Sequence, residues 1–314
     1  MKNRQKQFEA KLKEFPKPVR DILQTIPQQA GRLFSSQCTE LMKYLEIDPQ
    51  ELMIHLLPLA KIYAMVPVSR FQVGAVAMVG KQGAKDHADP FDLFLGANME
   101  FKHQALNQTI HAEQSATLNA WHQGARYLEA VATSEAPCGH CRQFLYEFEN
   151  NAKIRVITPD RQKHTYRQTP LSDLLPEAFG PLDLGNRTGL MSPATKDHKL
   201  QLSTTIQDQV VDEALSAAEK SYAPYTQNFA GCALKTQTGE IYGGRYVESA
   251  AYNPSMPPLQ SAILCMNMAS LEHRQSIQRV VLVEKPSQVS LRKATELLLA
   301  LWAPGIKLEY YKVK

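Results

Sequence analysis

Two kinds of hydrophobic pattern divide the first half of the chain. Residues 1–60 have a helical pattern, which five prolines cut into short pieces. From about residue 61, short apolar and β-branched runs alternate with longer helical segments. The runs predict strands at 71–79, 93–97, 128–133 and 154–158, and helices at 111–123 and 138–148. This alternation is typical of an α/β sandwich, so we expect a small helical appendage followed by an α/β unit.

Two segments carry no clear pattern. Residues 159–200 are rich in Pro, Gly, Asp and Thr, which predicts a long connection and a domain boundary. The polar segment from Lys81 to Pro90 is irregular, and no element is assigned to it.

Four short matches in the same order relate the two halves of the chain. They pair residues 73–77 with 230–234, 96–100 with 244–248, 114–116 with 260–262, and 135–137 with 284–286. The shared order favours duplication of one α/β unit, with chance similarity between two such units as the alternative.

The same register shows what the second copy lacks. His111 falls on Pro257, Glu113 on Leu259 and Cys138 on Ser287. A second copy without these side chains cannot hold a metal, so we expect it to be a structural partner.

The reactive side chains of the first copy lie in two motifs. His111-Ala112-Glu113 precedes Pro137-Cys138-Gly139-His140-Cys141, and Cys138 and Cys141 share a face at the start of a predicted helix. Unpaired N–H groups at a helix start stabilise thiolates. Two thiolates and one imidazole supply three ligands of a tetrahedral zinc and leave one position for water, as in catalytic sites. Glu113 would lie beside the metal, free to move a proton.

The two motifs are specific only in combination. A lone CxxC is common, whereas HxE followed by PCxxC on consecutive helices is the signature of zinc-dependent nucleobase deaminases. The alternative is a zinc site that only stabilises the fold, with His140 as a fourth ligand. That alternative gives Glu113 no role.

Several segments together resemble cytidine deaminase, in its longer, two-repeat, homodimeric bacterial form. They are residues 71–75, 96–101, 111–116, 137–144, 178–181 and 257–260. The resemblance extends over nearly the whole chain. It implies duplicated cytidine-deaminase-like α/β/α sandwich units with a small N-terminal helical appendage. The expected division is 1–60 for the appendage, 61–185 for the catalytic zinc-binding domain and 186–314 for the degenerate domain.

The resemblance also implies roles for single residues. One zinc per chain would be bound by His111, Cys138 and Cys141, with Glu113 as the catalytic proton shuttle. Substrate-binding positions would be Asn98 and Glu100 for the ribose hydroxyls and Phe71 for the pyrimidine. Without the resemblance, Phe71 is equally well explained as a core residue, and Asn98 and Glu100 as a polar strand end.

Two further positions qualify the resemblance. Phe179 matches, less firmly, a residue that completes the neighbouring subunit's site. Arg70 is a departure, because the family usually has a small polar residue there.

The implied reaction is hydrolysis of cytidine and deoxycytidine to uridine and deoxyuridine with release of ammonia, a step of pyrimidine salvage. Zinc-activated hydroxide would attack C4 of the ring, and Glu113 would protonate N3 and then the leaving amine. Two alternatives remain: deamination of a base in a polynucleotide, and a zinc-bearing scaffold protein without activity. The preference for ribose or deoxyribose is left open.

Composition narrows the partners and the compartment. The chain of 314 residues has a net charge of +4 from 35 basic and 31 acidic residues, which is too weak to favour a nucleic-acid partner. No apolar run approaches the length that spans a bilayer, and the N-terminus lacks the apolar core of a signal peptide. Five cysteines are an odd number, so reduced thiols are expected. We therefore expect a cytoplasmic homodimer that binds a small nucleoside and no membrane.

Overall fold

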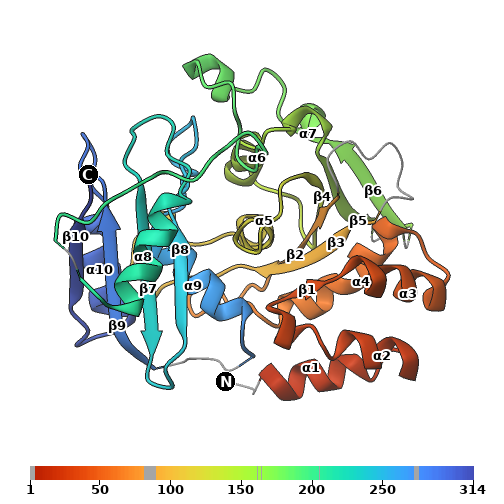
Figure 1. Cartoon of the computed structure of the whole chain (residues 1–314). Coiled ribbons are helices and arrows are strands. Elements are labelled where there is room, and N and C mark those ends of the chain that lie inside the picture. The colour runs from red at the N-terminus through yellow and green to blue at the C-terminus, as the bar shows by residue number, and fades with distance from the viewer. Residues whose placement is uncertain (1–3, 81–89, 161, 164, 205, 272–275) are drawn as a thin grey trace.

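The computed structural model describes residues 4–80, 90–160, 162–163, 165–204, 206–271 and 276–314. Most of the segment 81–90, to which the sequence assigned no element, lies outside these ranges. Two sheets stand side by side in Figure 1, with the N-terminal helices beside the first sheet. The predicted mixed α/β architecture is confirmed.

The predicted helical segment forms four helices. They are α1 (Arg4–Leu12), α2 (Lys17–Leu23), α3 (Ser35–Leu45) and α4 (Pro49–Lys61). Helix α4 begins where the Asp48 side chain accepts a hydrogen bond from the Glu51 N–H at 2.7 Å and Pro49 occupies the first turn. Between α2 and α3 lies a two-residue strand, β1 (Arg32–Leu33), which no sequence pattern predicted.

The first sheet has the order β1-β3-β2-β4-β5-β6. The four predicted strands are confirmed as β2 (Gly74–Val79), β3 (Asp92–Ala97), β4 (Leu128–Thr133) and β5 (Arg155–Asp160). The two predicted helices are confirmed as α5 (Ala112–His122) and α6 (Gly139–Leu145), and α6 connects the parallel strands β4 and β5.

The segment predicted as a bare connection carries structure of its own. It contains β6 (Thr165–Pro170), antiparallel to β5 at the sheet edge, and a single turn, α7 (Leu171–Leu174). The prediction missed β6 because this strand is mostly polar and exposed, so it lacks the apolar alternation that marks a half-buried strand.

The second sheet has the order β10-β9-β7-β8. Its elements are α8 (Gln209–Glu219), β7 (Ala230–Thr236), β8 (Ile241–Arg245), α9 (Pro258–Met268), β9 (Ile277–Glu284), α10 (Arg292–Trp302) and β10 (Leu308–Lys312). Short 3₁₀ turns, η1 to η4, lie at Pro27–Gln29, Leu106–Gln108, Asn151–Lys153 and Pro181–Leu184. In each sheet a helix connects two parallel strands, α6 between β4 and β5 and α10 between β9 and β10, so the two units share this part of their element order.

Two pairs of glycines extend the internal match to the helices. A Cβ on Gly96 would lie 2.1 Å from the Ala116 nitrogen, and one on Gly244 would lie 2.1 Å from the Ala262 nitrogen. In the same way, a Cβ on Gly74 would collide with the backbone of α4, and a Cβ on Gly231 would collide with that of α8. Helix α4 is thus the counterpart of α8. We infer that it belongs to the first copy, which would place the boundary with the appendage near residue 48 instead of 60.

Gly96→Ala is expected to destabilise the protein by at least about 3 kcal/mol, at or beyond the usual range for overpacking a core. The added methyl would enter the backbone of α5, which cannot retreat without disturbing the core. Urea unfolding measures the effect. Gly139→Ala is the control, because a Cβ there meets nothing within 4 Å. Equal stability of the two variants would contradict the close packing of β3 on α5.

The two copies pack through α5 and α9 in a reciprocal way. The Gln114 side chain donates to the Pro254 carbonyl at 3.0 Å, and the Gln260 side chain donates to the Gln108 side-chain oxygen at 2.7 Å. In the internal register Gln114 matches Gln260 and Gln108 matches Pro254. Each copy therefore reaches the same loop of the other, and one apolar core includes residues of both.

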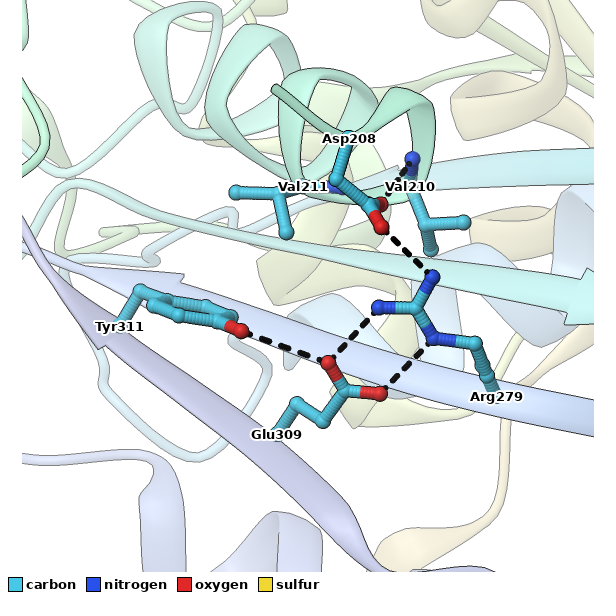
Figure 2. Close-up of polar contacts among 6 residues, drawn as sticks. All are labelled: Asp208, Val210, Val211, Arg279, Glu309 and Tyr311. Carbon is cyan, nitrogen blue, oxygen red and sulfur yellow. Dashed lines mark hydrogen bonds and ion pairs between the residues drawn. The ribbon is translucent and has the colours of Figure 1, made fainter. Parts of the chain in front are cut away.

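An ion cluster ties three elements of the second copy (Figure 2). Arg279 of β9 forms two hydrogen bonds with Glu309 of β10, at 2.8 and 2.7 Å, and one with Asp208, the N-cap of α8, at 2.9 Å. The hydrogen bonds to Arg279 are the main cause that lowers the pKa of both carboxyl groups below their usual range.

Arg279→Met is expected to lower the stability of the protein at pH 7 by at most about 1 kcal/mol, because the cluster is partly exposed. Carboxyl groups with depressed pKa values stabilise the fold above their ordinary pKa of about 4, and this contribution disappears as the pH falls through the folded values. The difference between variant and wild type should therefore begin to shrink as the pH falls below about 4 and continue to shrink as the pH passes through the lower folded pKa values. Urea midpoints measured across this pH range test this, and a difference that does not depend on pH would contradict it.

Candidate active site

The side chains of the two sequence motifs come together at the starts of α5 and α6. His111 is the N-cap residue of α5 and Cys138 that of α6, while Glu113 and Cys141 lie in the first turns. The His111 ring does not cap its own helix. Because the ring makes no such hydrogen bond, its nitrogens are available for other contacts. The backbone N–H of His111 donates to the Gln114 side chain at 3.2 Å.

Two of the three separations between the predicted ligand atoms match those that a zinc ion requires. With Zn–S bonds of about 2.3 Å and a Zn–N bond of about 2.05 Å, tetrahedral angles place two sulfurs about 3.8 Å apart and a sulfur and a nitrogen about 3.6 Å apart. Here Cys138 Sγ lies 3.7 Å from Cys141 Sγ and 3.5 Å from His111 Nδ1. All three ligand atoms lie within 4.8 Å of one another. The donor set and its geometry therefore fit zinc.

The two cysteines of the site differ in how readily they lose a proton. Contacts with the Cys141 thiol and with His111 lower the pKa of Cys138 to about 3, so one thiolate forms readily. The contact with Cys138, followed by burial and the nearby Glu113, raises the pKa of Cys141 well above its usual value. A second thiolate is disfavoured beside the first unless a positive ion separates them.

Glu113 is nearly buried, with 5% of its surface exposed. Burial is the main cause that raises the pKa of its carboxyl group. The contact with Cys138 raises the pKa of the His111 ring. Glu113 is not one of the three side chains that could hold a metal, and it interacts with the thiol of Cys141, which is one of them.

His140 gives no support to a site with four protein ligands. Its ring stacks on that of His111, with centroids 4.8 Å apart and planes inclined by 23°. Among the described residues, the group that could hold a metal contains His111, Cys138 and Cys141 and not His140.

The predicted sugar-binding residues lie beside a loop that they also hold in shape. One oxygen of Glu100 accepts from the Val68 and Ser69 N–H groups, both at 2.9 Å, and the other accepts from the Ser69 hydroxyl. Asn98 accepts from the Val73 N–H at 2.9 Å and donates to the Phe71 carbonyl at 3.0 Å.

The second copy repeats this loop. Glu248, the counterpart of Glu100, accepts from the N–H groups of Tyr225 and Thr226 and from the Thr226 hydroxyl. Arg70 and Gln227, at matching positions, both have positive φ angles, of 59° and 56°. Ser69, the hydroxyl partner of Glu100, was not predicted from the sequence. The signal for it was a further match, Ser69 with Thr226, in the same register.

Phe71 is 56% exposed, which excludes the core alternative for this residue. Phe179 is 47% exposed, and its carbonyl accepts from the Gln143 side chain of α6 at 2.7 Å. Two apolar side chains follow Phe179 on the same exposed segment, Leu182 and Leu184. In Figure 1 this segment extends away from both sheets, beyond α6.

Within the part of the chain that the structure describes, no helix has the length and apolar character needed to cross a bilayer.

Both halves of the chain match one family description. The family model for the cytidine and deoxycytidylate deaminase zinc-binding region matches residues 47–157, and a second model with the same description matches residues 171–296. The expected duplication of a deaminase-like unit is therefore confirmed, including in the copy that lacks the metal ligands.

Curated relatives match over most of their length. The cytidine deaminase of Sodalis glossinidius is 43% identical over 82% of this chain and 81% of its own, and that of Photorhabdus laumondii is 41% identical over 89% and 88%. Among solved structures, the cytidine deaminase of Burkholderia pseudomallei covers 41% of this chain and 98% of its own at 29% identity, with a TM-score of 0.33. From the two matching regions and the identity over most of the chain, it follows that this protein belongs to the cytidine deaminase family.

Proposed function

We propose that this protein catalyses the zinc-dependent hydrolytic deamination of cytidine and deoxycytidine, with release of ammonia. The observation that carries the proposal is the cluster of His111, Cys138 and Cys141, in which Cys138 lies at zinc-binding distances from the other two. The buried Glu113 lies next to this cluster but is not one of the possible metal ligands. A structural zinc site needs no such carboxyl group, whereas a hydrolytic site needs one to move protons.

Each side chain has a role in this proposal. His111, Cys138 and Cys141 hold the zinc, which when bound lowers the pKa of water and so supplies the nucleophile. Glu113 takes a proton from the attacking water and delivers it to N3 of the ring; it then takes the proton of the hydroxyl now on C4 and passes it to the leaving amine, so that C4 becomes a carbonyl and ammonia departs. Its raised pKa suits this exchange, because the group must both accept and give a proton near neutral pH.

The residues near the metal position suit a free nucleoside. Asn98 and Glu100 would engage the sugar hydroxyls, since an amide and a carboxylate can each bind an O–H group. Phe71 would pack on the pyrimidine, for which its exposed ring is available. We expect the enzyme to bind the tetrahedral form of the ring more tightly than the flat substrate, so a hydrated pyrimidine nucleoside should inhibit strongly.

A homodimer would complete the site. Phe71, Phe179, Leu182 and Leu184 are exposed apolar side chains, and a partner subunit would cover some of them. In this proposal Phe179 of each chain reaches the neighbouring site. We further propose a cytoplasmic location and a role in pyrimidine salvage, both of which follow from the proposed substrate.

The test is to incubate purified protein with cytidine, follow the loss of cytosine absorbance, and determine zinc in the same sample. Rapid conversion to uridine, a Michaelis constant insensitive to salt and about one zinc per chain are expected. Zinc without turnover of cytidine would contradict the proposal. A single-stranded oligonucleotide would then be the next substrate, because a polynucleotide deaminase shows strong salt dependence.

A further inference from the structure

Glu147 is a fully buried carboxylate that the proposed reaction does not use. It lies two residues beyond the end of α6, the helix that has Cys138 as its N-cap and Cys141 in its first turn. Three donors from the second copy surround its side chain. Tyr222 and Tyr225 donate their hydroxyl protons to Oε1 at 2.7 and 2.5 Å, and the Ala250 N–H donates to Oε2 at 2.8 Å.

A buried carboxylate such as Glu147 needs hydrogen-bond donors around it. A buried carboxylate is costly unless donors surround it, and hydrogen bonds to a charged acceptor are roughly twice as strong as neutral ones. Three donors from one direction therefore hold this side chain in one place. The next residues add to the tie, because the Glu149 N–H donates to the Leu190 carbonyl at 2.9 Å and the Gly189 N–H donates to the Glu149 side chain at 2.6 Å.

The loop that supplies Tyr225 is the one shared by both copies. In the second copy Glu248 accepts hydrogen bonds from the backbone of this loop, as Glu100 does from the matching loop of the first copy. In the first copy the residue that matches Tyr225 is Val68, which is 52% exposed. The second copy thus lacks the counterparts of the metal ligands but has kept the loop, and here the loop presents a tyrosine to the metal-bearing helix.

Helix α6 is short enough to need such support. It has seven residues, and helices of this length are not stable by themselves. Its N-cap and first turn carry two of the three proposed metal ligands, and its far end is fixed by Glu147. The direction of a helix about two turns long is determined by how its two ends are held, and that direction determines where both sulfurs lie relative to His111.

We propose that Glu147 is a positioning residue, through which Tyr222 and Tyr225 of the degenerate copy hold α6 so that Cys138 and Cys141 meet His111 at zinc-binding distances. The inference rests on the proposed zinc site. It gives the second copy a definite role, because that copy aligns the metal ligands of the first without touching the metal.

The double variant Tyr222→Phe, Tyr225→Phe tests this in the full-length protein, because it removes two donors and keeps both rings. Zinc affinity is measured by competition with a chromogenic chelator, and ligand geometry by the absorption spectrum of the cobalt-substituted protein. We expect zinc binding to weaken about tenfold or more, as for other residues that orient metal ligands, and the cobalt-to-thiolate and d–d bands to shift. Tyr310→Phe is the matched control, because it removes a hydroxyl that contacts Glu284 within the second copy, away from α6.

The outcomes separate the two proposals. A wild-type protein that binds zinc and a double variant with the same affinity and the same cobalt spectrum would overturn the positioning role and leave the zinc site standing. A wild-type protein without zinc affinity would overturn both. If the double variant does not fold, Tyr225→Phe alone is measured in the same way, and zinc binding equal to that of Tyr310→Phe would refute the role.

Discussion

Glu113→Ala is expected to retain about one zinc per chain and to lower kcat for cytidine by about a thousandfold or more. General acid–base catalysis contributes typically about 10²–10⁴-fold, and here one carboxyl group would serve two proton transfers. The metal should stay, because His111, Cys138 and Cys141 form the group that can hold it without Glu113.

Steady-state kinetics and metal analysis on the same samples measure both effects. Glu113→Gln keeps the shape of the side chain and should be nearly as inactive, which separates proton transfer from packing. Glu284→Gln is the matched control, since Glu284 is also a buried carboxylate, 1% exposed, but lies in the second copy. Appreciable turnover by Glu113→Ala would end the assignment of Glu113 as the proton shuttle.

Cys138→Ala is expected to abolish activity by removing zinc. Apparent zinc affinities of about 10–16 kcal/mol, shared among four ligands, correspond to about 3 kcal/mol for each, so affinity should fall at least about a hundredfold. The loss also removes the thiolate that lies 3.5 Å from His111 and 3.7 Å from Cys141, so the remaining two ligands lose the atom that both contact.

Chelator competition measures the affinity, and kinetics at saturating zinc show whether activity returns. Cys265→Ala serves as the control, because Cys265 is a free cysteine of the second copy and is not in the group that could bind a metal. Unchanged zinc content in Cys138→Ala would mean that the metal is held elsewhere, and the site would have to be reassigned.

Much of the first unit could be predicted from local pattern. The runs at 71–79, 93–97, 128–133 and 154–158 are apolar because these strands are buried, and burial leaves a pattern in the sequence. β1 and β6 could not be predicted in this way. The first has two residues, and the second is a polar edge strand that its neighbour β5 holds in place.

The internal duplication was also only partly visible in the sequence. Four short matches gave the register, but α4 has no sequence match with α8, and its equivalence rests on Gly74 and Gly231 pressing against the two helix backbones. Backbone contact requires a small residue at one position and leaves the sequence of the helix free. The four short matches therefore did not reveal that α4 belongs with the first copy, whereas the glycine contacts and the family match over residues 47–157 both indicate it.

The sequence by itself determined the chemistry of this protein: which side chains could bind zinc, which carboxyl group could move protons, and which copy lacks both. Spacing along a helix is sufficient for that, because Cys138 and Cys141 share a face wherever the helix lies. The tertiary structure alone decided how α5 and α6 meet, how Glu100 and Asn98 hold the 68–73 loop, and how Glu147 is tied to Tyr222 and Tyr225. These contacts join residues far apart in the chain, and a hydrogen bond across such a distance leaves no periodic trace in the sequence.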